Sequence, residues 1–163
     1  MAEIVPRTLR YYHLDGDVLS ETGELLREAG QEGLESVVVW LGRIIDDETA
    51  QVLAAHRPRQ ICFRSDDGVG VQIPLDAISE LISGLSAGVV VLARVHSHPH
   101  EAYHSEVDDG NALIAHHGAI SIVVPNFAAE PVHLQRCSVN ELRHGEGWIE
   151  LDPGEVEERF AVS

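Results

Sequence analysis

The chain has 163 residues, 44% of them hydrophobic, and a formal net charge of −16 at pH 7. This length and composition predict one folded domain over residues 1–163 and exclude a disordered polymer. The excess of acid argues against a nucleic-acid partner, because phosphate binding depends on basic patches. No apolar run reaches the roughly 18 residues of a membrane helix, and residues 1–14 lack an apolar signal core, so we expect no membrane partner and a cytoplasmic protein.

Apolar periodicity predicts alternating helices and strands. In chain order we expect a helix at 19–29, a buried strand at 36–41, a strand or helix at 51–56, a hairpin at 61–73, a helix at 74–85, a buried strand at 89–96, a helix at 105–117, strands at 120–124, 132–139 and 148–151, and a short helix at 155–160. The hairpin turn is predicted by Asp66-Asp67-Gly68. The fold class is therefore α/β or α+β, with one mixed sheet flanked by helices.

The strand predicted at 89–96 runs into His96-Ser97-His98-Pro99. Two histidines at positions i and i+2 of an extended chain point to the same side. Asp108, a short loop later, can complete a set of three metal ligands. Three protein ligands and one open position are typical of a catalytic zinc, whose bound water is acidified. The segment therefore predicts one zinc ion and metal-assisted hydrolysis.

Ser105 stands at the predicted start of the helix at 105–117, three residues before Asp108. As an N-cap it lies near the expected metal, where its hydroxyl can donate a hydrogen bond to an oxyanion. The other interpretation is that Ser105 only caps the helix. His100, Glu101 and His104 crowd the same loop; they could bind substrate or a second metal, but a solvated loop is the favoured interpretation.

A metal hydrolase also needs a carboxylate that carries a proton from the attacking water to the leaving amine. Glu35 is the best candidate, because it stands at the entrance of the buried strand at 36–41. We expect this strand to be a neighbour of the strand that carries His96. Burial and the attraction of the metal would then act on the pKa of Glu35 in opposite directions.

The order Glu35, His96-Ser97-His98-Pro99, Ser105 and Asp108 resembles the JAMM motif of the MPN (JAB domain) zinc metalloproteases. The apolar strand after Glu35 ends at Gly42, which fits the family spacing, and the resemblance covers residues 35–124. It implies a fold similar to that of cytidine deaminases. It also implies zinc held by the two histidines and Asp108, with Glu35 as general acid and base and Ser105 stabilising the intermediate.

Two positions depart from the family pattern. The loop between Pro99 and Ser105 is one residue shorter than usual, so counting from His98 selects Asp109 as the third ligand, whereas counting from Ser105 selects Asp108. We prefer Asp108, because helical geometry sets the serine-to-aspartate offset and a loop absorbs a deletion. The glycine often found three residues after the glutamate is Val38 here, which alters packing rather than chemistry.

The resemblance is to stand-alone bacterial members. It implies hydrolysis of an isopeptide or peptide bond after the C-terminus of a ubiquitin-like protein, in deconjugation or precursor processing. Partners would be that modifier or its conjugate and the activating and conjugating enzymes of the same operon, including antiphage defence operons. The modifier's tail would lie along a strand edge, for which we expect 61–73. Two alternatives stay open: release of an amino acid such as cysteine from a sulfur-carrier protein, and a catalytically silent MPN scaffold.

Overall fold

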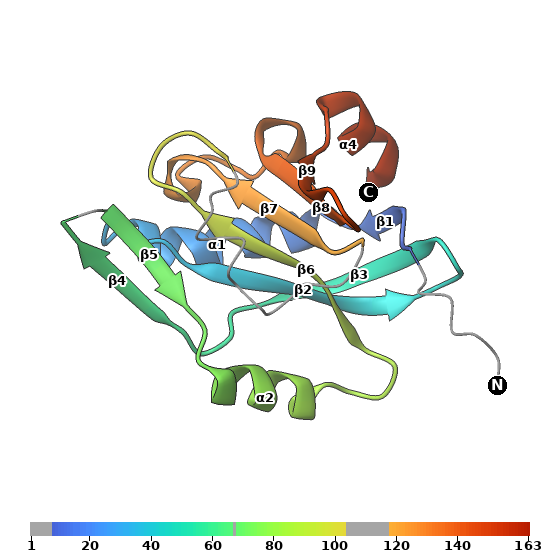
Figure 1. Cartoon of the computed structure of the whole chain (residues 1–163), viewed down its shortest axis with the longest axis horizontal. Helices are drawn as coiled ribbons and strands as arrows, with labels where there is room; N and C mark the ends of the chain where they lie inside the picture. The colour runs from blue at the N-terminus through green and yellow to red at the C-terminus, as the bar shows by residue number, and fades with distance from the viewer. Residues whose placement is uncertain (1–7, 67, 104–117) are drawn as a thin grey trace.

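The computed structural model of the chain describes residues 8–66, 68–103 and 118–163. Its centre is an eight-stranded mixed sheet with the strand order β10-β1-β3-β2-β6-β7-β8-β9 (Figure 1). The strands of this sheet are β1 (Tyr11–Leu14), β2 (Val37–Ile44), β3 (Thr49–His56), β6 (Val90–Ser97), β7 (Ile120–Val124), β8 (Ser138–Arg143), β9 (Gly147–Glu150) and β10 (Phe160–Val162). The architecture is thus a mixed α+β fold, in agreement with the predicted class.

The remaining elements surround the sheet. Strands β4 (Ile61–Ser65) and β5 (Gly68–Gln72) form a separate antiparallel hairpin, as predicted. The helices are α1 (Gly16–Gly30), α2 (Leu75–Gly84) and α4 (Pro153–Arg159), and single 3-10 turns occupy Asn126–Ala128 and Leu134–Arg136. Figure 1 shows the hairpin and α2 projecting from one side, with α1 lying across one face of the sheet. None of the described helices is both long enough and apolar enough to cross a membrane.

Helix α1 is anchored to the sheet through a buried polar contact. The Asp15 carboxylate caps its first turn by accepting from the N–H groups of Asp17 and Val18. Further along, the Thr22 hydroxyl donates to the Val18 carbonyl over 2.7 Å and accepts the indole N–H of Trp40 over 3.0 Å. Because Trp40 is on β2, the contact shows that the even-numbered residues at the start of β2 face α1.

The core strands match the prediction of buried, β-branched runs. All five residues of β7 and the first four of β2 are buried, since the sheet is covered on both faces there. Residues 51–56, compatible with either structure in the sequence, lie in strand β3. The helix predicted at 105–117 lies outside the described residues.

One predicted strand is displaced, and two observed strands were not predicted. The strand expected at 132–139 begins only at Ser138, because Leu134–Arg136 close a 3-10 turn, and it continues to Arg143 through the buried polar residues Asn140 and Glu141. Strands β1 and β10 were not expected. Helix α4 ends at Arg159, and the chain then pairs parallel to β1, a short strand with too little sequence to show a period of two.

A buried ion pair fixes this C-terminal segment. The Arg159 guanidinium donates to the Glu141 carboxylate on β8 and to the backbone carbonyl of Arg10. Both charged side chains are nearly buried. Beside them the ring of Tyr12 stacks on Phe160 with centroids 5.0 Å apart, and burial raises the pKa of the Tyr12 hydroxyl. Helix α4 is therefore held by directional contacts as well as by packing.

Candidate metal centre

His96 and His98 lie at the carboxyl end of β6, in the middle of the sheet. Their exposed fractions are only 3% and 4%, and their ring centroids are 5.0 Å apart. His96 is paired with Val37 of β2, and directly opposed residues point to the same side of a sheet. Neighbouring residues of a strand alternate between the two faces, so Val37 lies on the face opposite that of Trp40, which faces α1. His96 shares the face of Val37, and the His98 ring, two residues later, lies beside the His96 ring. Both histidines therefore project from the face opposite α1. The sequence prediction that they share one side is confirmed.

The backbone after β6 is held by the segment that follows β7. His98 donates its N–H to the Val124 carbonyl over 2.9 Å, while Phe127 and Asn126 donate theirs to the carbonyls of His98 and His100 over 2.8 and 2.9 Å. Three backbone hydrogen bonds thus hold the loop. The edge of the Tyr103 ring also contacts the His98 imidazole, with centroids 4.7 Å apart.

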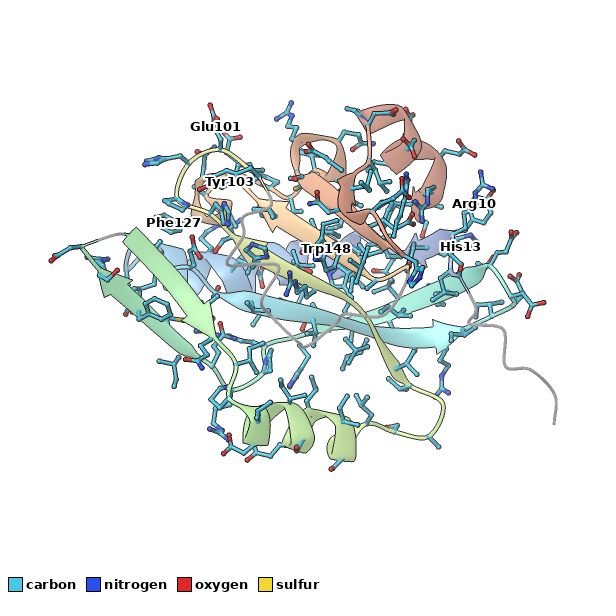
Figure 2. All side chains as sticks on the ribbon, in the orientation of Figure 1. Arg10, His13, Glu101, Tyr103, Phe127 and Trp148 are labelled. Carbon is cyan, nitrogen blue, oxygen red and sulfur yellow. The ribbon has the colours of Figure 1, made fainter. Side chains whose placement is uncertain are left out.

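The segment that receives this loop is conformationally strained. Asn126, Phe127 and Ala128 all have positive φ, of 56°, 53° and 56°, a left-handed turn without glycine. Such residues cost on the order of 1 kcal/mol each, and Asn tolerates the conformation best. Figure 2 shows Phe127 and Tyr103 at the same end of the molecule, away from Arg10 and His13. Arg27 of α1 restrains the turn by donating to the Ala128 carbonyl over 2.8 Å.

The pairing of β2 with β6 brings the segment that carries Glu35 to this end of the sheet. The strands are antiparallel, with Val37 opposite His96, and the Ser97 N–H donates to the Ser36 carbonyl over 3.2 Å. The β2–β6 ladder ends at Val37 opposite His96, so Glu35 lies two residues beyond the last regular pair, at the end of β2 that neighbours His96. The prediction that the strand after Glu35 neighbours the strand of His96 is confirmed. Glu35 is half-buried at the end of the sheet.

Sequence reasoning missed a buried arginine two residues before His96. Arg94 is 1% exposed and lies on the histidine face of β6. Its Nε donates to the Ser121 hydroxyl over 3.1 Å, and its guanidinium lies 5.3 Å from the ring centroid of Trp148. The available signal was an arginine inside an otherwise apolar strand, which must be paired when it is buried.

The two histidines fit the donor set of a bound metal. Neutral imidazoles are good ligands for zinc and other late transition metals, and these two are rigidly held, buried and directed to one side. Within residues 8–66, 68–103 and 118–163 no group of three His, Cys, Asp or Glu side chains gathers. Ser105, Asp108, Asp109 and His104 lie outside the described residues. His100 and Glu101 are exposed.

No family model matches the chain. Its fold is similar to the folds of solved proteins, including the following two. Protein DSY2949 from Desulfitobacterium hafniense superposes with a TM-score of 0.60 over 93% of this chain and 92% of that one, at 18% identity. A protein from Salinibacter ruber (strain DSM 13855) gives a TM-score of 0.54 over 86% and 88%, at 22% identity. At these identities the likeness concerns the fold alone.

A curated relative is similar to the chain in sequence as well. Over 144 residues, 88% of each chain, the sequence is 35% identical to the probable metalloprotease y4jG of Sinorhizobium fredii (strain NBRC 101917 / NGR234). The buried histidine pair and this relative together define a metalloprotease, a hydrolase that works with a bound metal ion. The chain belongs to the family of the probable metalloprotease y4jG.

Proposed function

We propose that the chain is a zinc-dependent peptidase of the JAMM (MPN/JAB) type, which hydrolyses the bond after the C-terminus of a ubiquitin-like protein. The observation that carries the proposal is the buried histidine pair at the end of β6, with the chain segment of Glu35 entering the neighbouring strand β2. A carboxylate beside an imidazole pair is the minimum that metal-assisted peptide hydrolysis needs. The metalloprotease family supports the same chemistry at a coarser level.

Each residue has a proposed task. His96 and His98 would hold the zinc with Asp108 as third ligand, and the bound ion would supply Lewis acidity toward the attacking water and the scissile carbonyl. The Glu35 carboxylate accepts the proton of that water and delivers it to the nitrogen of the leaving amine. The Ser105 hydroxyl donates a hydrogen bond to the developing oxyanion. Burial of both histidines keeps competing water away from their rings.

Room for a polypeptide substrate supports the proposal. A cavity of about 700 Å³ opens beside the loop after the histidines. Its walls come from that loop, from the end of β7, from the starts of β8 and α4, and from the end of β9. This volume lies in the range of sites that enclose several side chains. One of the residues that line this cavity, His100, follows His98 by two positions.

The proposed partner is a ubiquitin-like protein or its conjugate, together with the activating and conjugating enzymes that attach it. We propose that the modifier's tail adds as a strand to the β4–β5 hairpin. Among the described strands β4 and β5 pair only with each other, which leaves their outer edges open. Ile61 and Phe63 on β4 are 54% and 44% exposed and offer apolar contacts to such a tail.

The test is cleavage of ubiquitin-like proteins from the chain's own genomic neighbourhood, each carrying a C-terminal peptide extension. We expect chelator-sensitive cleavage after the modifier by the wild-type protein. Glu35→Gln should keep zinc but lose cleavage, whereas Glu32→Gln, an exposed acid three residues earlier, should retain both.

Three results contradict the proposal. Normal cleavage by the Glu35→Gln variant would reject Glu35 as proton carrier. Release of a single amino acid from a sulfur-carrier adduct, with no cleavage of the fusions, would change the substrate class. A purified protein without metal that cleaves nothing would identify a silent scaffold.

A further inference from the structure

The end of β2 that carries Glu35 lies where the sheet comes apart. Strand β3 pairs with β2 only as far as His56 opposite Val39, and the β2–β6 ladder ends at Val37 opposite His96. Glu35 therefore stands two residues beyond the last regular pair with β6 and four residues beyond the last pair with β3. A residue in that position has no strand ladder of its own to fix it.

On the β6 side a serine hydroxyl takes over the missing ladder bond. Ser36 and Ser97 occupy a position where antiparallel strands normally exchange two backbone hydrogen bonds. One of them forms, from the Ser97 N–H to the Ser36 carbonyl. In place of the second, the Ser36 N–H donates to the Ser97 hydroxyl over 3.3 Å. Both serines are fully buried, so this N–H has no water to replace the hydroxyl.

The strands separate here because β6 follows β7 instead. Ser97 is paired with Val124 of the parallel strand β7, and His98 donates its N–H to the Val124 carbonyl. Beyond Ser97 the backbone of β6 is thus committed to β7. The backbone N–H and the side chain of Ser97 are the groups that bond Ser36, in the segment that carries Glu35.

On the β3 side a glutamine amide replaces the departed strand. The Gln60 side chain accepts the Val37 N–H through Oε1 and donates to the Val37 carbonyl through Nε2, both over 2.8 Å. The same Nε2 donates to the Pro58 carbonyl over 2.9 Å. Pro58 lies near the position where β3 would have continued, and proline has no N–H to offer. A single amide therefore supplies both bonds that a strand residue would have made.

We infer that Ser97 and Gln60 are positioning residues that hold Glu35 against the histidine pair. The inference rests on the proposed role of Glu35 in proton transfer. Each side chain binds the backbone one or two residues after Glu35, from opposite sides, and neither bonds the histidine rings. They therefore act on the placement of the carboxylate while the histidines, fixed by β6 itself, retain the metal.

The first test compares Ser97→Ala and Gln60→Leu with the wild type on the best-cleaved fusion of a ubiquitin-like protein. A displaced carboxylate lowers the rate of proton transfer, so kcat should fall about 10- to 100-fold in each variant. KM and the zinc content should stay at the wild-type level. Ser97→Thr, which keeps the hydroxyl, should restore most of kcat.

Matched controls separate positioning from stability. Thr22→Val removes a buried hydroxyl that accepts an N–H from another element, as Ser97→Ala does, but it lies on α1. Gln51→Leu removes a half-buried glutamine amide from β3. Both should keep wild-type kcat at temperatures well below unfolding. Gln60 is half-buried, so Gln60→Leu opens no cavity in the core and gives a result independent of Ser97.

Amide hydrogen exchange needs no substrate, so it tests the two hydrogen bonds separately from the proposed function. Amide hydrogen exchange at Ser36 should be about tenfold faster in Ser97→Ala, and that at Val37 about tenfold faster in Gln60→Leu, since each N–H loses its acceptor. Unchanged kcat in both variants, with Glu35→Gln inactive, would overturn the inference and leave the proposed function standing. If the wild type cleaves no fusion, the proposed function fails. Unchanged amide exchange at Ser36 and Val37 in the two variants would show that Ser97 and Gln60 do not hold the segment that carries Glu35.

Discussion

Phe127 donates its backbone N–H to the carbonyl oxygen of His98 over 2.8 Å from a left-handed conformation with φ of 53°. A bulky residue adopts this conformation only where its surroundings impose it. Gly30 at the end of α1 is one such constraint, since a Cβ at that position would lie 2.6 Å from both the Cβ and the carbonyl oxygen of Phe127. The last residue of α1 is thus packed directly against the turn that holds the metal-site loop.

Substituting Gly30 by alanine should therefore disturb the metal site from a distance. The new methyl forces the turn away from α1, which weakens the bond to His98. We expect a loss of about 1–3 kcal/mol in the free energy of unfolding, and about tenfold weaker zinc binding, measured by urea denaturation and by competition with a chromogenic chelator. Gly84→Ala is the control, because a Cβ there meets nothing within 4 Å. Unchanged zinc affinity in Gly30→Ala would separate the turn from the site.

The two candidates for the third ligand make opposite predictions. With Asp108 as ligand, Asp108→Asn should purify with little zinc, because a neutral amide is a poor replacement for a carboxylate. Asp109→Asn should carry the wild-type amount. The measurement is metal content by plasma mass spectrometry, with His98→Ala as the metal-free reference. The reverse pattern would assign the ligand to Asp109, the residue selected by counting from His98.

The contact between Thr22 and Trp40 should be essential for stability but not for activity. Thr22→Val keeps the volume of the side chain and removes the acceptor of a fully buried indole N–H. An unsatisfied buried donor costs about 1–3 kcal/mol, which urea denaturation followed by tryptophan fluorescence should detect. A variant as stable as the wild type would mean that the indole N–H finds another acceptor.

The Glu141–Arg159 pair should make stability depend on pH. Burial alone would raise the pKa of Glu141, but hydrogen bonds from Arg159 and Arg143 outweigh it and hold this pKa below its usual value. A lowered folded pKa stabilises the protein above the pKa of an unfolded glutamate, about 4.3, and this stabilisation is lost as the pH falls through the folded pKa.

We therefore expect Glu141→Gln to lower the free energy of unfolding by about 3 kcal/mol at pH 7. The difference from the wild type should shrink below about pH 4. Arg59→Gln provides the contrast, because Arg59 bonds Asp76 and Glu80 on an exposed surface and should contribute little at any pH. A pH-independent difference for Glu141→Gln would exclude an ionised partner for Arg159.

The parts of the fold that the sequence predicts are those with a strong period. Helix α1, strands β2, β6 and β7 and the β4–β5 hairpin follow from apolar spacing and turn residues. Strands β1 and β10 could not be predicted, because each is short and exists only through parallel pairing with distant residues. The continuation of β8 to Arg143 has a similar cause, since buried Asn140 and Glu141 bond Ser121 of β7 and Arg159 of α4.

The candidate site also has one part that the sequence predicts and one part that it does not. The side shared by His96 and His98 follows from local strand geometry, and the neighbourhood of Glu35 follows from two adjacent buried strands. The contributions of Arg94, Ser97 and Gln60 could not be predicted, because each depends on a partner on another part of the chain: the Ser121 hydroxyl for Arg94, and backbone groups of Ser36 and Val37 for the other two. These partners can be identified only when strand order and register are known.

The pairing of β2 with β6 also has a consequence for how the chain folds. These neighbours in the sheet are separated by the β3 strand, the hairpin and α2 in the sequence, so a long loop must close before they meet. His96 and His98 are near each other in any extended chain, whereas Glu35 joins them only after this closure. Because the proposed mechanism needs Glu35 as well as the histidine pair, it predicts hydrolysis only after β2 and β6 have paired.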